Sequence, residues 1–411
     1  MRFLVSLIEQ GLGSVLTFGV NLWLIRNGEA ASYGVYVFWY AIAWMLGTLQ
    51  GTLAITHLFA LPSERDHPAA RRQPERFLLS VMLALVLAAA VAVAAGNAVL
   101  DAAGSSLAQG SAVLFIPAFL LFQYVRAFAF SRQRPRLATA LSAAVLAVTA
   151  AGLAFDAALG DAPTAGRVMF IVGLAYGLPA IAVLLILLQG MSPMLDAAGL
   201  RRHVPVLRGS GWLLLGAGSG EVTSRLYSFA VVGRFGTEAL AALSAVQVVI
   251  RPAWMLSAAW ISVGFPAMSG RWKAGDTAAV VRTMAQGVAL TTGASLAWSA
   301  VVVLAWPWIS GTLYGGRYTE VGWLAYLWGA NVVLGSIAAV LNTGMLSIGE
   351  FRRLALLDMA GALVVIVATA VVLARFSYGA AVVATLLGQA TQIALMAGVL
   401  RQRLRVPAVA A

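Results

Sequence analysis

Long apolar stretches recur along the entire sequence, and they limit most strongly what this chain can fold into. A helix needs about 20 predominantly apolar residues to cross the roughly 30 Å hydrocarbon core of a bilayer. Of the 411 residues, 61% are hydrophobic and 10% are charged, whereas soluble domains are about 25% charged. The sequence therefore predicts an all-α polytopic membrane protein with about twelve transmembrane helices and no sizeable soluble domain. The predicted spans are residues 4–25, 33–61, 77–95, 111–130, 137–155, 168–188, 209–233, 239–268, 286–309, 321–348, 354–376 and 379–400.

The basic residues are unevenly distributed over the loops between these spans. Nineteen of the 27 Lys and Arg residues lie at the two ends of the chain and in every second loop, and five lie in the other loops. Short loops rich in Lys and Arg stay on the cytoplasmic side of the membrane. Both termini are therefore predicted to be cytoplasmic, which agrees with an even number of spans. Topology also explains the net charge of +12, so we expect no nucleic-acid partner.

Several classes of chemistry are disfavoured by what the sequence lacks. There is no cysteine, which excludes disulfides and thiolate catalysis. The three histidines are scattered without the spacing of a metal site. No Walker motif is present, and no loop carries a Ser-His-Asp or paired-carboxylate arrangement. We therefore expect a protein that is not an enzyme and that uses no metal or cofactor.

The predicted spans fall into two sets of six. The longest polar link, residues 189–208, separates an N-terminal lobe of residues 1–188 from a C-terminal lobe of residues 209–411. A short pattern at the end of the first span, residues 26–30, returns at the end of the seventh, residues 234–239. Because six is even, duplicated halves keep the same orientation, as in transporters built from parallel repeats. The sequence thus predicts two six-helix lobes joined by a cytoplasmic linker.

One arginine lies in the middle of an apolar segment. Arg251 falls within residues 246–265 and is followed by Pro252. A charge at the bilayer centre costs from about 3 to more than about 10 kcal/mol, and it is tolerated where it faces a hydrated cavity or pairs with another charge. Proline kinks a helix, and a guanidinium matches the oxygens of a phosphate. We therefore expect Arg251 to bind an anion in a hydrated cavity; the alternative is an ion pair with Glu221 across helices.

A second pair of charges lies near the middle of the preceding span. Glu221 and Arg225 are four residues apart, so they share one face of a helix. In one interpretation the two side chains neutralise each other and hold the bundle together. In the other interpretation, Arg225 binds the anion, while Glu221 modulates this binding by Arg225 or carries a coupling proton or sodium ion.

Three other charged residues fall within predicted spans. Glu9 lies about two turns from the cytoplasmic side. We expect it either to take part in gating or coupling, or to pair with a loop arginine. Arg126 lies near the cytoplasmic end of its span and is expected to extend its guanidinium to the interface. Asp358 is expected in the first turn of its helix, where a carboxylate complements the helix dipole.

An aromatic stripe runs along the second predicted span. Tyr36, Tyr40 and Trp44 are spaced by four residues and share a helix face. The stripe either stacks on sugar rings in a cavity or forms an aromatic belt at the periplasmic interface, where such residues are common.

Three local patterns combine with the number and layout of the spans. Residues 26–34 form a short glycine-containing connection after the first span, residues 132–136 a basic turn after the fourth, and residues 344–353 a G-x-x-R-like turn after the tenth. Together they resemble the multidrug/oligosaccharidyl-lipid/polysaccharide exporter superfamily, and within it the Wzx-type O-antigen and exopolysaccharide flippases. The resemblance implies a V-shaped pair of six-helix lobes around a central cavity that opens alternately to each side.

The resemblance also implies a function. It suggests a flippase that moves undecaprenyl-pyrophosphate-linked oligosaccharide from the cytoplasmic to the periplasmic leaflet of a bacterial inner membrane, with the pyrophosphate on Arg225 and Arg251. Membrane lipids and the polysaccharide polymerase and chain-length proteins are the implied partners, and a monomer is expected. Two alternatives stay open. One is a multidrug or toxin cation antiporter of the same superfamily, which should favour acids in its cavity, and the other is a non-transporting scaffold of a polysaccharide assembly complex.

Overall fold

The fold is helical throughout the part of the chain that the structure describes. A computed structural model describes residues 2–62, 68–188, 190–207 and 210–405, and every regular element in them is a helix. Ten of these helical segments are long and apolar enough to cross a membrane. The predicted all-α polytopic membrane fold is therefore confirmed. The chain forms two compact units, Met1–Leu214 and Leu215–Ala411.

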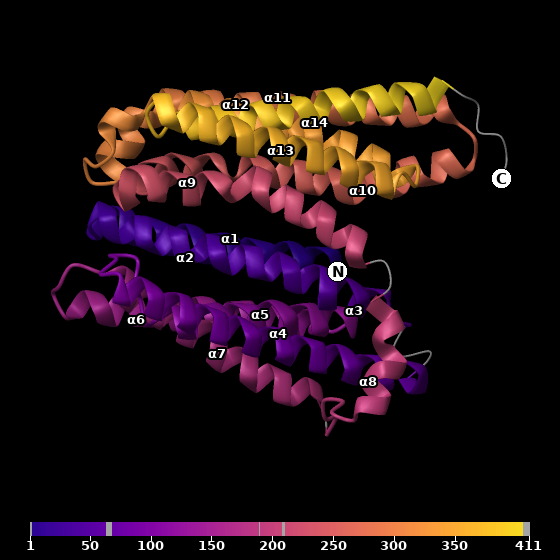
Figure 1. Cartoon of the computed structure of the whole chain (residues 1–411), viewed down its shortest axis with the longest axis horizontal. Helices are drawn as coiled ribbons and strands as arrows, with labels where there is room; N and C mark the ends of the chain where they lie inside the picture. Colours follow the sequence, from indigo (N-terminus) through magenta and orange to yellow (C-terminus); the bar gives the residue numbers. More distant parts are fainter. Residues whose placement is uncertain (1, 63–67, 189, 208–209, 406–411) are drawn as a thin grey trace. The chain divides into compact units, whose positions relative to one another are not determined.

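The first unit is organised around α5. Its neighbours α2, α4, α6 and α7 all contact it, and α1 packs on α6 (Figure 1). Apolar side chains along α5, such as Phe115 and Phe128, are fully buried by these neighbours. The elements of this unit are α1 (Arg2–Asn27), α2 (Ala30–Gln50), the π-helix η1 (Gly51–Ile55), α3 (Thr56–Ala60), α4 (Pro68–Ala102), α5 (Ala112–Ser131), α6 (Pro135–Ala158), α7 (Ala165–Leu188), α8 (Ala197–His203) and the 3₁₀-helix η2 (Val204–Leu207).

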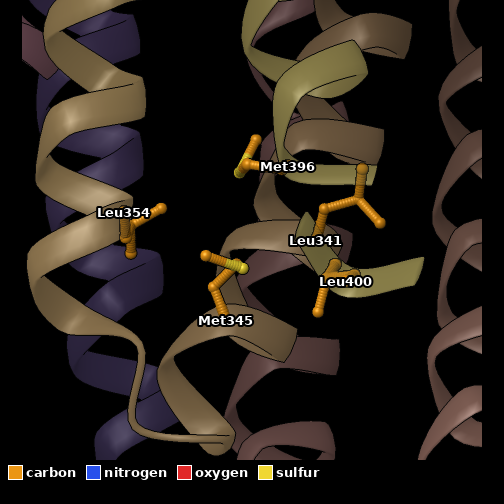
Figure 2. Close-up of a cluster of buried hydrophobic side chains, with 5 residues drawn as sticks. All are labelled: Leu341, Met345, Leu354, Met396 and Leu400. Atoms are coloured by element: carbon orange, nitrogen blue, oxygen red, sulfur yellow. The ribbon is translucent and has the colours of Figure 1, made fainter. Parts of the chain in front are cut away.

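In the second unit α12 is the central helix, and it contacts α10, α11, α13 and α14. Figure 2 shows one of its buried clusters, near the turn that joins α12 to α13, where side chains of α12, α13 and α14 meet. The cluster consists of Leu341, Met345, Leu354, Met396 and Leu400. The elements that contribute to this unit are α9 (Ser210–Ile250), α10 (Ala253–Lys273), α11 (Thr277–Trp308), η3 (Ile309–Leu313), η4 (Thr319–Val321), α12 (Leu324–Ser347), α13 (Phe351–Arg375) and α14 (Ala380–Arg405).

A glycine lies at the end of the first and of the seventh predicted span. Gly28 lies between α1 and α2, where an added Cβ would come within 2.9 Å of a carbonyl oxygen. Gly236 lies inside α9 with φ 82° and ψ −179°, so α9 is two helices that meet at this residue. These two helices correspond to the seventh predicted span and the first part of the eighth. Pro252 then divides the eighth span, which the sequence predicts as continuous, and α10 forms the rest of it.

The polar link after α7 is not an extended linker. Residues 190–207 contain α8 and η2, and they pack against α4 within the first unit. The boundary between the compact units falls between Leu214 and Leu215, inside α9. The predicted division into residues 1–188, 189–208 and 209–411 stays a prediction.

Candidate functional site

The predicted intramembrane ion pair is present on α9. The Nε atom of Arg225 lies 2.7 Å from Oε2 of Glu221, and the two side chains are 19% and 17% exposed. Along the helix axis Glu221 is about 16 Å from Ser210 and Arg225 is about 14 Å from Arg234. The pair therefore lies near the middle of this helix, and an anion-binding or coupling role for it stays a prediction.

Arg251 lies at a break between two helices. Arg251 and Pro252 form a turn that separates α9 from α10. Because proline has no N–H, one carbonyl of the preceding turn loses its helical donor. That carbonyl belongs to Val248. The next carbonyl, that of Val249, accepts the indole Nε1–H of Trp298 on α11 at 3.0 Å. At the kink that the sequence predicts, the helix thus gives way to a two-residue turn, Arg251–Pro252, before α10 begins.

The guanidinium of Arg251 is held by an amide. Its Nη2 donates to Oε1 of Gln247 at 3.2 Å, and the buried Tyr227 hydroxyl donates to the same oxygen at 3.0 Å. Within the described ranges Arg251 makes no ion pair, and Glu221 is bonded to Arg225 instead. The alternative pairing of Arg251 with Glu221 is therefore not seen. The four-residue spacing from Gln247 to Arg251 indicates one contact in advance, whereas no sequence pattern indicates Tyr227.

A second acid–arginine pair lies within the first unit. Glu9 of α1 is 3% exposed, accepts the Ser142 hydroxyl at 2.8 Å and lies 3.2 Å from Nε of Arg126 on α5. Arg126 also donates to Gln123 at 3.2 Å. The partner of Glu9 is thus an arginine within a helix, not one in a loop. This pair holds one side of the Arg126 guanidinium, and the side chain is 36% exposed. Extension of Arg126 to the interface and gating or coupling by Glu9 stay predictions.

The aromatic stripe of α2 is packed inside the first unit. Tyr36 and Tyr40 are 2% and 6% exposed, and their rings stack with centroids 5.8 Å apart. Phe115 and Phe119 of α5 cover this stripe, with Trp44 centred 5.7 Å from Phe119. In this conformation the rings join α2 to α5, and contact with sugars stays a prediction.

Asp358 lies deeper than the sequence predicts. Because α13 begins at Phe351, Asp358 is two turns inside the helix, and its predicted place in the first turn is wrong. Its Oδ1 accepts from Nε2 of Gln392 on α14 at 3.4 Å, and its Oδ2 lies toward Gly216 of α9. Helix starts are hard to place from hydropathy here, because the turn before α13 is itself partly apolar. Over the described residues no group of three or more His, Asp or Glu side chains is arranged to hold a metal ion.

Sequence reasoning missed a buried ionic cluster, which we call the Arg71–Glu75–Arg132 cluster. These three side chains are 3%, 2% and 7% exposed, although the sequence suggests only loop charges that set topology. Glu75 contacts Nε of Arg71, and its Oε2 lies 2.6 Å from Nη2 of Arg132. The four-residue spacing of Arg71 and Glu75 is a readable signal for the first contact. The contact with Arg132 joins α4 to the end of α5 and has no signal in the sequence.

Every guanidinium nitrogen of this cluster has a partner. Arg71 donates to the Pro62 carbonyl and to a serine hydroxyl of α5, both at 2.8 Å. Arg132 donates to the Leu187 carbonyl at the end of α7 at 2.6 Å and lies 4.5 Å from the ring centroid of Phe128. Buried charges are stabilised when they are paired and fully hydrogen-bonded. The cluster therefore fastens α4, α5 and α7 together at one end of the unit.

Three solved structures with a similar fold are described as transporters or as a flippase. The chain matches an inward-facing multidrug resistance MATE family transporter of the MOP superfamily with a TM-score of 0.69 and 12% identity, covering 97% of this chain and 98% of that one. It matches the inward closed conformation of the lipid II flippase MurJ with a TM-score of 0.71 and 11% identity, covering 97% and 87%. A MOP superfamily transporter from Pyrococcus furiosus, described as having a binding pocket of reverse polarity that suggests a different function, matches with a TM-score of 0.64 and 14% identity, covering 98% and 94%.

Sequence comparisons give no closer assignment. No family model matches the chain, and no curated protein matches it. The identities to the solved structures, 11–14%, support a statement about fold alone. Because the matches cover nearly the full length of both partners, they include both units of the chain. The protein therefore shares its fold with these solved structures.

Proposed function

We propose that the protein is a flippase that moves undecaprenyl-pyrophosphate-linked oligosaccharide from the cytoplasmic to the periplasmic leaflet by alternating access, for O-antigen or exopolysaccharide assembly. The observation that carries the proposal is the position of Arg251, which lies at a helix break far from either end of its membrane-spanning segment. Along the helix axes it lies about 20 Å from Glu238 and about 30 Å from Arg271, which are the nearest charged residues in sequence on either side. A guanidinium in this position stabilises an anion that passes through the membrane.

The pattern of pairing favours an anion over a cation. Arg251 is bonded to the neutral amide of Gln247, so its charge is not compensated by an acid within the described residues. The acids Glu9 and Glu221 each contact an arginine. Moving a pyrophosphate through a low-dielectric interior without a cation is prohibitive. An arginine with a displaceable neutral partner provides that cation.

The class of substrate is inferred from the shared fold. One similar structure is a lipid II flippase, which supports a lipid-linked substrate for this chain. In such a substrate the long acyl tail stays in the bilayer while the charged head crosses through a hydrated passage. Arg225 provides a second guanidinium for the pyrophosphate once Glu221 releases it. We further infer that the chain is a monomer in the bacterial inner membrane with both termini in the cytoplasm, and that it acts beside polysaccharide polymerase and chain-length proteins.

A cation antiporter is the second candidate, and Asp358 is the observation that favours it. This carboxylate lies between α13 and α14 with an amide partner, and it makes no ion pair with the described residues. Multidrug MATE transporters have the same fold. An organic cation would find a counter-charge at Asp358, whereas Arg251 would repel it.

Reconstituted liposomes separate the two candidates. The purified protein receives, in separate experiments, a fluorescent polyprenyl-pyrophosphate sugar in one leaflet and a cationic dye with a pH step. A flippase accelerates the loss of lipid asymmetry and leaves the dye where it is. Dye movement without a lipid effect would establish the antiporter and reject our proposal.

Charge-removing variants test the site itself. Arg251→Gln is expected to reduce the flipping rate at least about tenfold, because a charge-assisted hydrogen bond to phosphate is worth about 1.5–3 kcal/mol. Arg225→Gln is expected to reduce it less, since Glu221 already compensates that charge. Arg282→Gln removes the same charge from the exposed surface of α11 and serves as the matched control. Equal rates in the Arg251 variant and the control would refute the assignment of the site.

A further inference from the structure

The chain between α7 and α9 is fixed to the first unit beside the start of α4. Met194 is 2% exposed; its N–H donates to the Arg76 carbonyl at 3.3 Å, and its carbonyl accepts the Ser80 hydroxyl at 2.8 Å. Further along, the ring of His203 stacks on Phe77 with centroids 5.9 Å apart. Residues 190–207, which we call the connecting segment, therefore have a defined place on α4.

The sequence of α4 shows at which depth this place lies. Residues 71–76 include four charged side chains, whereas residues 77–100 include none. A charge-free apolar run of that length lies in the hydrocarbon core, so the border between headgroups and acyl chains falls close to Arg76 and Phe77. The connecting segment contacts both residues and also Ser80, about one turn deeper. It therefore lies at the membrane–water interface.

The exposed side chains of the connecting segment are both apolar and cationic. Leu195 is 82% exposed and Val204 is 54% exposed. Arg201 and Arg202 at the end of α8 are also exposed. Asp196 is the only acid of the segment; it is exposed and caps α8, where it accepts a backbone N–H at 2.7 Å. With two exposed arginines against this one carboxylate, the exposed charge of the segment is net positive.

We infer that the connecting segment is an interfacial anchor that binds anionic phospholipid headgroups. Exposed apolar side chains beside basic ones are characteristic of segments that lie in the plane of a membrane surface. In this position Leu195 and Val204 enter the boundary between headgroups and acyl chains, and Arg201 and Arg202 bind lipid phosphates. Each basic residue near an anionic surface strengthens binding about fivefold. The anchor requires only that the first unit spans a membrane, and it is independent of the substrate that the protein carries.

Single-cysteine labelling tests the anchor directly, because the chain contains no cysteine. Leu195→Cys carries an environment-sensitive fluorophore, and the full-length protein is placed in nanodiscs of phosphatidylcholine with increasing amounts of phosphatidylglycerol. Quenching by lipids with a nitroxide near the headgroup is expected to rise with the phosphatidylglycerol fraction and to fall at high salt, which screens the charges. Arg201→Gln together with Arg202→Gln is expected to weaken the apparent lipid affinity roughly 25-fold.

A label at Ala274→Cys is the control, because Ala274 is an exposed residue of the short turn between α10 and α11. It is expected to show weak quenching that does not depend on phosphatidylglycerol. Quenching of the Leu195 label no greater than that of the Ala274 label would overturn the interfacial location. Strong quenching that neither phosphatidylglycerol nor the arginine substitutions change would overturn the recognition of anionic lipid. All substituted residues are exposed, so the variants are expected to fold.

Discussion

Replacing Glu75 with glutamine tests whether the Arg71–Glu75–Arg132 cluster holds the first unit together. The substitution keeps the size of the side chain and removes only its charge. Both guanidinium groups then lose their acid while they stay buried, since the arginine side chains are 3% and 7% exposed. Neither can reach water without unpacking α4 from α5. The variant should therefore be much less stable than the parent protein.

The size of the effect follows from the burial of the cluster. Removing one partner of a buried ion pair costs about 3–5 kcal/mol, because the remaining charge is uncompensated. For a unit of roughly 200 residues, each kcal/mol lowers the melting temperature by about 2–4 °C. Glu75→Gln is therefore expected to lower the melting temperature of the first unit by roughly 6–20 °C. Tryptophan fluorescence during heating in detergent measures this change, since Trp23, Trp39 and Trp44 lie within the first unit.

The chain supplies a matched control at Glu350. This carboxylate also contacts two arginines, with Nε of Arg403 at 2.6 Å and Nε of Arg353 at 3.4 Å. Those arginine side chains are 46% and 48% exposed, and solvated ion pairs contribute only about 0–1 kcal/mol each. Glu350→Gln is thus expected to change the melting temperature by a few degrees at most. If Glu75→Gln and Glu350→Gln shifted it equally, burial would not control the energy of these pairs and the reasoning would be refuted.

Four further substitutions probe α9. Gly236→Ala should destabilise the protein by about 1–3 kcal/mol, because φ 82° with ψ −179° is open only to glycine. Its control Gly233→Ala should be neutral or stabilising, because nothing lies within 4 Å of the added Cβ. Equal unfolding temperatures of the two variants would contradict the assignment of backbone strain to Gly236. Gln247→Leu should cost about 1–3 kcal/mol in thermal unfolding, since it leaves the buried Tyr227 hydroxyl without its acceptor. Gln247→Glu should keep stability but slow lipid flipping, because the new carboxylate pairs with Arg251; an unchanged flipping rate would count against an anion at this site.

Sequence alone predicts most of the fold, for a physical reason. In hydrocarbon every backbone polar group must be bonded internally, so apolar stretches of spanning length form helices. The interruptions are also readable, since Gly236 and Pro252 are residues that end helices. The effect of such a residue on the helix is harder to predict than its position, because a proline can kink a helix or end it. Here α9 ends at Ile250, two residues before Pro252, and an indole donor from α11 bonds to the Val249 carbonyl. That donor comes from a residue about 50 positions away in the chain.

The candidate site was predictable only where its contacts are local. Glu221 with Arg225 and Gln247 with Arg251 are four residues apart, so helix geometry alone brings them together. The partner of Glu9 depends on how α1 packs against α5, and one sequence contains no measure of that packing. For the same reason Tyr36 and Tyr40 were not recognisable as core residues, since an aromatic stripe at helical spacing looks the same in a core, a belt or a cavity.

The local partners also set an order in which the two arginines would meet an anion. For an incoming pyrophosphate to bind Arg251, it displaces a neutral amide at 3.2 Å. To bind Arg225, the pyrophosphate must displace the Glu221 carboxylate, which lies 2.7 Å from the guanidinium. This charge-assisted hydrogen bond is about twice as strong as one between neutral groups. Under the proposed function Arg251 is therefore the first contact, and Arg225 joins only when Glu221 gains another partner or a proton. Glu221→Gln should then strengthen binding of the pyrophosphate and slow its release, so that apparent affinity rises while turnover falls. A variant that loses affinity instead would show that Glu221 supports Arg225 and does not compete with the substrate for it.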